Sequence, residues 1–269
     1  FKILNNNLLH TTRILEVDAV AIGYKSKKQM LTIAKGISFS LDEGELTAVV
    51  GANGIGKSTL LRTLCGIQPK LGGAIFLNGK ILEKHKPIEL ASELSLVLTE
   101  QIPTKNLTVA EVVALGRQPY TNWLGTLTET DVNKVNEAIN LVSLEELKQK
   151  KCYELSDGQF QKVMIARALA QDTSLIVLDE PTTHLDIYHK AYILKLLKRV
   201  AHETKKTILF STHEIDLAIQ LCNKILVMGA ENHFFDDPCK LIDQGAFKQL
   251  FPSDLIDFDA KTGHFNIHR

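Results

Sequence analysis

The sequence predicts an α/β fold built around a largely parallel β-sheet. Three short apolar runs, at 46–50, 175–178 and 207–211, have the length and composition of buried strands. Between the second and third runs, apolar residues recur with helical spacing over 186–203. A strand, a helix and a second strand in this order form a βαβ unit, which makes the two strands parallel neighbours in one sheet.

The first part of the chain is predicted to be rich in strands. Apolar residues over 14–24 and 37–41 indicate two strands, which the polar stretch KSKKQ joins as a hairpin. The apolar run at 46–50 leads through a glycine-rich loop into a helix expected from about Lys57 to Cys65. The stretch AIFLNGK then continues as a further strand and a turn.

The middle of the chain is predicted to be helical, over roughly 87–172. Within it, TETD at 128–131 has the form of a capping box that opens a helix through Leu141. Strands return with the apolar runs described above and with KILVM at 224–228. Beyond that strand the pattern weakens, and 230–269 is predicted to be an irregular appendage.

The composition is that of a globular protein and argues against nucleic-acid binding, a membrane span and secretion. Lys and Arg number 31, as do Asp and Glu, so no sequence-wide positive charge exists to hold nucleic acid through its phosphates. No apolar run reaches the roughly 18–20 residues of a membrane helix, and residues 1–7 lack the pattern of a secretory signal. The scattered thiols of Cys65, Cys152, Cys222 and Cys239 fit a reducing cytosol.

Residues 51–58, GANGIGKS, match the G-x-x-x-x-G-K-[ST] pattern of a phosphate-binding loop in full. The glycines let backbone N–H groups point at phosphate oxygens, and Lys57 can reach the β- and γ-phosphates. Ser58 offers a hydroxyl to Mg²⁺. The predicted nucleotide-binding residues of this segment and the next residue are Gly51, Asn53, Gly54, Gly56, Lys57, Ser58 and Thr59.

Two adjacent acids end the apolar run at 175–178. Asp179 is well placed to hold hydrated Mg²⁺ beside a phosphate-binding loop. Glu180 can orient or deprotonate the attacking water, or it is a solvated acid that caps the helix after Pro181. Because both acids end a buried strand, the sequence favours the catalytic role for Glu180.

His213 also lies at the end of an apolar strand. A histidine there is by itself more typical of packing or of the surface. However, the carboxyl ends of strands in one parallel sheet open into the same crevice, so we expect Gly51, Asp179 and His213 to converge. That convergence favours a role for His213 at the phosphates.

A second feature that suits an anion is ELSDGQ at 154–159, a polar turn before an apolar helix. The segment LSDGQFQKVMIARALA resembles the LSGGQ signature of ABC-type ATPases. THLD at 183–186 and STHE at 211–214 follow in the order of that family, and the resemblance covers about 14–230. The chain therefore resembles the ATP-binding subunit of an ABC transporter.

The resemblance implies a P-loop NTPase fold of the ABC nucleotide-binding type, with a RecA-like core, an antiparallel β subdomain and a helical subdomain. It places the ABC ATPase domain at 14–230, the helical subdomain at about 87–172 and a C-terminal appendage at 231–269. ATP and Mg²⁺ are the implied cofactors. Lys57, Glu180 and His213 are the implied catalytic residues.

In the ABC family two ATPase domains face each other head to tail, and the signature turn of one contacts the γ-phosphate held by the other. Ser156, Gly158 and Gln159 would therefore serve the nucleotide of a second copy, because this chain has one cassette. Asp186 matches an aspartate that couples the two sites, and it can also cap the helix that follows. Asp157 replaces a common glycine, outside the contacting positions.

Two more positions follow from the resemblance. Tyr24 matches an aromatic residue that stacks on adenine, although it can also be simply the boundary residue of its strand. The family's lid glutamine, which contacts metal or water, follows a strand similar to LSLVL at 94–98. Either Gln101 fills that role with a one-residue shift or Glu100 occupies the position, and the sequence leaves both open.

NLTVAEVVALGRQPYTNWLG at 106–125 resembles a stretch of ATPase subunits of importers for iron–siderophore complexes, haem and cobalamin. It predicts a short amphipathic helix followed by Arg117, Tyr120 and Trp123, a surface suited to docking. The aromatic residues can instead pack inside the helical subdomain.

The resemblance implies an iron–siderophore importer first, with haem or cobalamin as alternatives. The partners would be integral membrane permease subunits and, indirectly, a substrate-binding protein, with no nucleic acid. The ATPase would lie on the cytoplasmic face of the inner membrane as a peripheral protein.

Other classes of function are alternatives. A soluble ABC-type ATPase of translation predicts two cassettes in one chain, and the sequence has no such internal repeat. An ATPase of iron–sulfur assembly predicts soluble partners, against which the docking stretch argues modestly. A binding module without turnover is disfavoured by the presence of Lys57, Asp179, Glu180 and His213 together.

Overall fold

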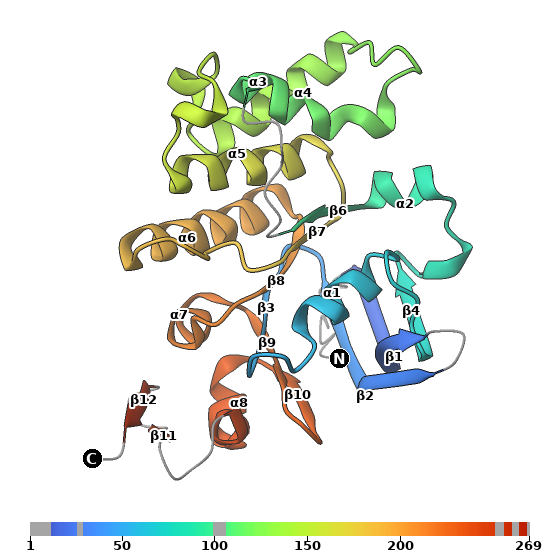
Figure 1. Cartoon of the computed structure of the whole chain (residues 1–269), viewed down its shortest axis with the longest axis vertical. Helices are drawn as coiled ribbons and strands as arrows, with labels where there is room; N and C mark the ends of the chain where they lie inside the picture. Colours follow the sequence, from blue (N-terminus) through green and yellow to red (C-terminus); the bar gives the residue numbers. More distant parts are fainter. Residues whose placement is uncertain (1–11, 26–28, 99–105, 251–255, 260–263, 268–269) are drawn as a thin grey trace, which may run out of the picture.

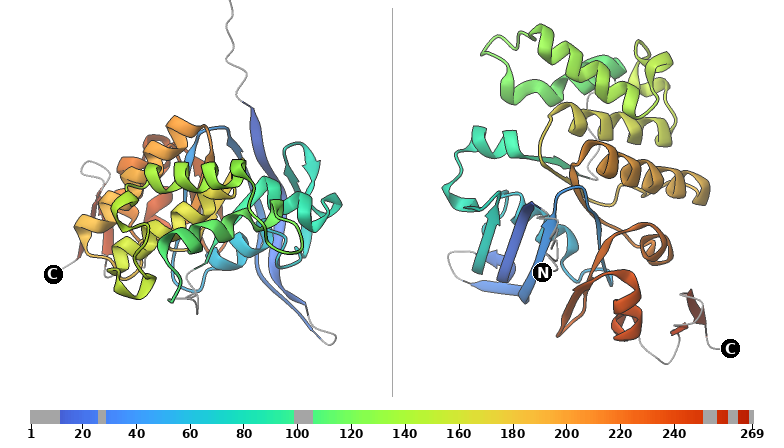
Figure 2. Two further views of the ribbon diagram at one scale, coloured as in Figure 1. Left: turned by 90° about the horizontal axis from the view of Figure 1, so that it is seen from above. Right: turned by 180° about the vertical axis from the view of Figure 1, so that it is seen from behind.

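The computed structural model describes residues 12–25, 29–98, 106–250, 256–259 and 264–267 of the 269-residue chain. Within these ranges the strands form a six-stranded sheet, a four-stranded sheet and a two-stranded ribbon, with helices around them (Figure 1). A group of helices, from α3 (Val109–Ala114) to α5 (Asp157–Ala170), occupies one end of the long axis. The four-stranded sheet and the C-terminal segment lie towards the other end, on opposite sides (Figure 2).

The six-stranded sheet has the order β10-β9-β3-β8-β7-β6, in which only the edge strand β10 is antiparallel to its neighbour. Its strands are β3 (Leu46–Gly51), β6 (Leu94–Val97), β7 (Leu175–Leu178), β8 (Thr207–Ser211), β9 (Lys224–Met228) and β10 (His233–Asp236). Every residue of β3, β7 and β8 is buried, as expected of strands covered on both faces. The order places the carboxyl ends of these three strands side by side.

Alternate residues of the parallel strands face two different cores. Ala48 and Val50 of β3 belong to the core that includes residues of α3 to α5 and of α6 (Ile187–Thr204), whereas Val49 belongs to the core that includes α1 (Lys57–Leu64) and the four-stranded sheet. The same alternation separates Ile176 from Val177 in β7. This two-residue period is the geometric reason that one sheet holds the helical group and the second sheet together.

The four-stranded sheet is antiparallel, with the order β2-β1-β4-β5. Its elements are β1 (Arg13–Lys25), β2 (Met30–Asp42), β4 (Gly72–Leu77) and β5 (Lys80–Ile81), and it is followed by η1 (Leu82–Lys84) and α2 (Pro87–Glu93). The predicted hairpin is confirmed by the pairing of β1 with β2. The second strand begins well before the predicted 37–41 because Met30 and Leu31 pair with Lys25 and Tyr24.

The predicted helical region contains both helices and a core strand. Its helices are α3 (Val109–Ala114), η2 (Leu115–Tyr120), α4 (Glu129–Leu141), η3 (Glu145–Leu147), η4 (Cys152–Glu154) and α5 (Asp157–Ala170). The predicted capping box at α4 is confirmed, because the Thr128 hydroxyl accepts from the Asp131 amide. The predicted range of 87–172 also includes β6, at the LSLVL strand, which pairs with β7 in the parallel sheet and so belongs to the core.

The segment after β9 is not irregular, and that prediction is wrong. It contains β10, α8 (Pro238–Asp243), η5 (Ala246–Leu250), β11 (Ile256–Asp259) and β12 (His264–Ile267). The two helices that precede it in the core are α6 (Ile187–Thr204) and α7 (Ile215–Leu221). Phe247 is fully buried, and its ring lies 5.1 Å from that of Phe258. Aromatic packing therefore orders a stretch whose local periodicity is weak.

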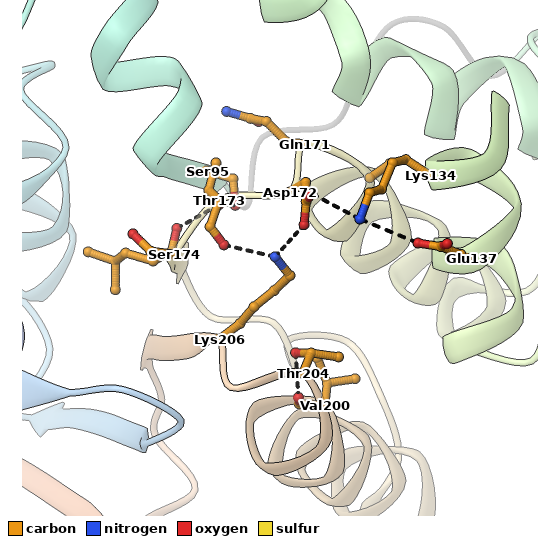
Figure 3. Close-up of polar contacts among 12 residues, drawn as sticks. Ser95, Lys134, Glu137, Gln171, Asp172, Thr173, Ser174, Val200, Thr204 and Lys206 are labelled. Carbon is orange, nitrogen blue, oxygen red and sulfur yellow. Dashed lines mark hydrogen bonds and ion pairs between the residues drawn. The ribbon is translucent and has the colours of Figure 1, made fainter. Parts of the chain in front are cut away.

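The turn between α5 and β7 joins the helical group to the parallel sheet (Figure 3). Asp172 accepts from Lys206 Nζ at 2.8 Å and also lies 3.0 Å from Nζ of Lys134, which belongs to α4. Burial raises the pKa of Asp172, but hydrogen bonds from Lys206 and Lys134 outweigh it, so the net pKa lies below its ordinary value. The carboxylate thus links two lysines from separate parts of the fold.

No helix within the described ranges combines the length and the apolar character needed to cross a membrane.

Candidate functional site

The phosphate-binding loop has the conformation that its glycines permit. It leaves β3 at Gly51 and enters α1 at Lys57. Gly54 and Gly56 have φ angles of 78° and 108°, which side chains rarely adopt. A Cβ atom on Gly56 would also lie 2.7 Å from a methyl carbon of Ile33. The loop therefore requires glycine at position 56 for both conformation and space.

Lys57 places a cation inside this loop. Its Nζ donates to the carbonyl oxygens of Gly51 and Ala52, at 2.9 and 3.2 Å, and the residue is only 6% exposed. Burial lowers the pKa of Lys57, while the nearby charges of Glu180 and Asp179 oppose that shift. The structure thus holds an ammonium group at the turn where the loop would receive an anion.

Asp179 and Ser58 form a pair of oxygen ligands suited to Mg²⁺. Asp179 Oδ1 accepts from Ser58 Oγ at 3.0 Å and from Ser211 Oγ at 2.7 Å. Adjacent ligands of an octahedral ion with bonds of about 2.1 Å lie about 3.0 Å apart. The spacing of these two oxygens therefore fits neighbouring positions around Mg²⁺ without a change of fold.

Glu180 is held by three neighbouring groups. Its Oε1 accepts from His213 Nε2 at 2.8 Å, and its Oε2 accepts from Thr183 Oγ1 at 3.0 Å. Its amide donates to Ser211 Oγ at 2.9 Å, and its φ angle is positive, at 49°. Burial raises the pKa of Glu180, but the hydrogen bonds from His213 and Thr183 outweigh it, and the net pKa is lowered. Glu180 is therefore an oriented carboxylate that is ionised at neutral pH.

Ser211 is a residue of this site that the sequence reasoning did not single out. It is the last residue of β8, and its one hydroxyl contacts both acids. The sequence signal that could have found it is its place at the end of the buried strand beside β7, two residues before His213.

The predicted convergence of the strand ends is confirmed by a cavity of about 260 Å³ at the carboxyl edge of the sheet. Its lining residues are Tyr24, Ile33, Asn53, Gly54, Gly56, Lys57, Ser58, Thr59, Glu180 and His213. Gly51 and Asp179 do not line the cavity themselves, but each accepts a hydrogen bond from a residue that does, Lys57 and Ser58 respectively. The cavity thus brings a phosphate-binding loop, an acid pair and a histidine together.

Tyr24 lies at the rim of this cavity and near the end of β1. Its side chain is half exposed, and its hydroxyl lies 3.4 Å from Thr59 Oγ1. This position leaves the ring open to a planar ligand, and stacking on adenine stays a prediction. Gln101 and Glu100, the two candidates for the lid position, lie outside the described residues.

The signature turn is built differently and lies elsewhere. The Ser156 hydroxyl caps α5 by accepting from the amide of Gln159, whose side chain accepts in return from the Ser156 amide. Ser156 is exposed, and none of the described residues that line the cavity comes from 154–159. The first turn of α5 therefore presents helix N–H groups to solvent and not to the loop of its own chain.

The N-terminus of α6 lies beside the N-terminus of α5. Asp186 caps α6, because its Oδ1 accepts from the His189 amide at 2.8 Å, and the same oxygen lies 2.9 Å from His189 Nδ1. The backbone hydrogen bond from His189, followed by its ring, lowers the pKa of Asp186. A Cβ atom on Gly158 would lie 3.0 Å from the His189 ring. The sequence reasoning missed His189, whose only signal is its place three residues after a capping aspartate.

The docking role predicted for Arg117 is wrong. Its side chain is buried, donates to Asp131 Oδ1 at 2.9 Å and to the Ala170 carbonyl at 2.7 Å, and lies over the ring of Tyr120. Charged groups with such partners hold helices together and are not available to another protein. By contrast, Trp123 is 89% exposed and Leu124 is 67% exposed. The exposed part of the predicted surface therefore includes two large apolar side chains.

Comparison with known proteins gives concordant results. Residues 34–183 match the sequence model of the family described as ABC transporter. The iron(3+)-hydroxamate import ATP-binding protein of Bacillus subtilis is 34% identical over 214 residues, which cover 80% of this chain and 78% of that protein.

Two solved structures agree with this match. An inward-facing ABC transporter assigned to the metal-chelate type has a TM-score of 0.77 at 26% identity, and the match covers 95% of this chain and 96% of that chain. A dimeric ATP-binding cassette in a post-hydrolysis state, bound to ADP and Pi, has a TM-score of 0.66 at 26% identity, with 82% and 98% covered. The family match includes the phosphate-binding loop, Asp179 and the N-terminus of α5.

Proposed function

Because this chain belongs to the ABC transporter family and is an ATPase, we propose that it powers a membrane importer of iron–siderophore complexes. The observation that carries the catalytic part is the single cavity that unites Lys57, Ser58, Glu180 and His213, with Asp179 directly behind Ser58. The support for the cargo is the iron(3+)-hydroxamate import relative.

The residues of the loop bind the triphosphate. Backbone N–H groups of 51–58 and the N-terminus of α1 face its oxygens, and the Lys57 ammonium exchanges carbonyl acceptors for phosphate oxygens. Ser58 and Asp179 hold Mg²⁺, which supplies neutralising charge to the β- and γ-phosphates when it is bound. Tyr24 stacks on the adenine at the rim.

Glu180 acts on the attacking water. Its lowered pKa keeps it as a carboxylate at neutral pH, so it can accept a hydrogen bond from water and take its proton. His213 and Thr183 fix both of its oxygens, and Ser211 fixes its backbone amide. A base held in this way loses little freedom when the reaction begins.

The second half of the site comes from another copy of the chain. The exposed first turn of α5, with Ser156 and Gly158, faces the γ-phosphate of the partner, and Asp186 couples the two sites. This arrangement is supported by the position of α5 outside the chain's own cavity. It is also supported by the dimeric form of the cassette solved with ADP and Pi.

The membrane partner docks on the helical group. Trp123 and Leu124 give that group an exposed apolar surface, which suits burial against cytoplasmic helices of permease subunits. The ATPase then lies peripherally on the cytoplasmic face of the inner membrane, and the permease connects it to a substrate-binding protein.

Substitution of Glu180→Gln tests the catalytic assignment. The amide keeps the shape of the side chain but cannot take a proton, so we expect ATP binding to persist while hydrolysis falls about 10²-fold or more. The measurements are nucleotide affinity and phosphate release. The matched control is Glu231→Gln, which makes the same change at an exposed position. Near-normal turnover of Glu180→Gln would remove Glu180 as the base.

Uptake assays in cells that lack this subunit test the cargo. Loss of iron(III)-hydroxamate uptake, with haem and cobalamin uptake retained, is the expected pattern. Loss of haem or cobalamin uptake alone would replace the proposed cargo while leaving the ATPase assignment intact. Co-purification of a polytopic membrane protein with the wild type, and less of it with Trp123→Ser, tests the docking surface.

A further inference from the structure

A buried histidine outside the nucleotide cavity lacks the partners that such a group needs. The side chain of His85 is only 1% exposed, and neither ring nitrogen has a hydrogen-bond partner among the residues that the structure describes. Buried polar side chains in folded proteins are nearly always hydrogen-bonded or bound to a metal. His85 follows η1 and precedes α2, where the antiparallel sheet connects to the parallel one.

Two carboxylates face this histidine. Glu89 and Glu93 lie four residues apart on α2, which places them on the same side of the helix. His85 Nδ1 lies 3.7 Å from Glu93 Oε1. One ring nitrogen and one oxygen from each glutamate all lie within 4.8 Å of one another. The three groups therefore surround a common point.

Neighbouring polar groups orient the two carboxylates. Glu93 Oε2 accepts from the side chain of Asn78 at 3.0 Å, while Glu89 Oε1 accepts from Lys80 and its Oε2 accepts from the Lys86 amide at 3.2 Å. An ionised carboxylate has about four acceptor sites, so each glutamate keeps lone pairs for a further partner. Outer hydrogen bonds of this kind position the ligands in protein metal sites.

We propose that His85, Glu89 and Glu93 bind a divalent transition-metal ion such as Zn²⁺. One imidazole nitrogen and two carboxylate oxygens form a mixed set that suits Zn²⁺ better than Mg²⁺ or Ca²⁺, which prefer oxygen alone. The fourth position of the ion is left to water. The ion gives the histidine nitrogen the partner that it lacks.

The three ligands can close around such an ion by side-chain movement. Tetrahedral Zn²⁺ with bonds of about 2.0–2.1 Å needs ligand atoms about 3.4 Å apart, closer than the 4.8 Å limit of this cluster. The glutamate side chains are 37% and 26% exposed, so they have room to change rotamer, whereas the buried imidazole stays fixed. The site is thus a loose arrangement that the ion completes.

This site is separate from the Mg²⁺ site of the nucleotide. None of its three ligands is among the described residues that line the nucleotide cavity. The bound ion clamps the start of α2 to its last turn, and Glu93 extends the clamp to Asn78 in the turn between β4 and β5. Because α2 leads directly into β6, the ion stiffens the connection between the two large sheets.

Lys80 gives the proposal an unusual signature. Its ammonium group is paired with Glu89 and competes with a metal cation for that carboxylate. We therefore expect Lys80→Gln to bind Zn²⁺ more tightly than the wild type does, whereas Glu93→Gln binds it more weakly. Weaker binding to Lys80→Gln than to the wild type would count against this site.

The direct test is calorimetric titration of Zn²⁺ into the full, nucleotide-free chain after treatment with a chelator, together with elemental analysis. We expect His85→Gln to bind one ion fewer than the wild type and Glu93→Gln to bind that ion at least about tenfold more weakly. Glu83→Gln is the matched control, because Glu83 is an exposed acid of the adjacent η1 that pairs with Lys70, and it should behave as the wild type.

Thermal unfolding supplies a second readout that survives a folding defect in one variant. Zn²⁺ should raise the unfolding temperature of the wild type and of Glu83→Gln, with a smaller rise for Glu93→Gln. If His85→Gln does not fold, the other two variants decide the question, because Zn²⁺ affinity should fall in Glu93→Gln and rise in Lys80→Gln. The same number and affinity of bound ions in wild type, His85→Gln and Glu93→Gln would overturn the proposal. So would the absence of Zn²⁺ binding by the wild type, as expected if water alone satisfies His85.

Discussion

The nucleotide cavity and the tip of α5 differ in how completely one chain satisfies them. In the cavity, Lys57, Asp179 and Glu180 each have two or more hydrogen-bond partners from neighbouring elements of the same chain. At the tip, the side chains of Ser156 and Gln159 each accept from the other's backbone amide in the capping box, and Ser156 is exposed to solvent. The first region is assembled by folding alone, whereas the second keeps backbone N–H groups at the start of α5 that can donate to a ligand.

In the proposed dimer, this contrast explains why one chain carries two features suited to an anion. A phosphate-binding loop can bind nucleotide alone, so its own chain must pre-form it. An exposed helix N-terminus that approaches only in a dimer can report whether nucleotide is present in the partner. The packing of Gly158 against His189, which Asp186 orients, fixes the position of that tip without burying it.

The sharpest way to separate the two regions is to disable each in turn. We expect Asp179→Asn to lose Mg²⁺-dependent nucleotide binding and Ser156→Arg to retain it in the monomer, while both lose hydrolysis by about 10³-fold. Thr128→Ala is the control for loss of a helix cap, because it uncaps α4 away from the site. Equal loss of monomer nucleotide binding in Ser156→Arg and Asp179→Asn would contradict the claim that the tip of α5 does not serve the cavity of its own chain.

A large effect on stability is expected from Arg117→Ala in the helical group. The substitution leaves Asp131 buried without its cation and frees the Ala170 carbonyl at the end of α5. Breaking such a buried pair destabilises a protein by about 3 kcal/mol or more. Urea unfolding measures this, with Lys134→Gln as the half-exposed control. A change below about 1 kcal/mol would mean that the pair does not hold α5 in place.

The smallest effect is expected at the joint between the helical group and the parallel sheet. The pKa of Asp172 is lowered from 3.8 in the folded chain, so its ion pairs stabilise the fold above that pH. The stabilisation is lost as pH falls through the lower folded pKa. Because the groups are partly exposed, each pair contributes less than about 1 kcal/mol.

Urea midpoints of the wild type and Asp172→Asn measure this contribution. The difference between the two should be present at about pH 6 and should shrink towards about pH 3. Asp243→Asn, at an exposed position of α8, is the matched control and should show no such difference. A difference between wild type and Asp172→Asn that grows as pH falls would contradict the assigned sign.

Local patterns were sufficient to predict the parts of the fold with strong geometric demands. Positive φ angles favour glycine at 54 and 56 of the loop, and buried strands with polar ends predict the convergence of Gly51, Asp179 and His213. The α4 cap followed from a four-residue pattern alone. The loop and the cap depend on residues close in sequence, whereas the convergence of the strand ends follows from the parallel order of neighbouring strands.

The features that escaped prediction depend on which elements pack against one another, which no local pattern or strand-order rule indicates. Arg117 appears exposed in a short amphipathic stretch, but Asp131 and the end of α5 bury it. The C-terminal segment has weak periodicity, yet Phe247 and Phe258 order it by packing. The double contact of Ser211 and the isolation of His85 likewise require the assembled fold.

The sharing of each site between two copies is tested most directly by mixing two inactive proteins. Lys57→Ala keeps the α5 tip but lacks the loop cation, whereas Ser156→Arg keeps the loop but lacks the tip. A mixed dimer then contains one intact composite site, and an equal mixture should regain roughly a quarter of wild-type hydrolysis. Hydrolysis that stays at the sum of the separate proteins, in mixtures shown to contain mixed dimers, would contradict the shared site.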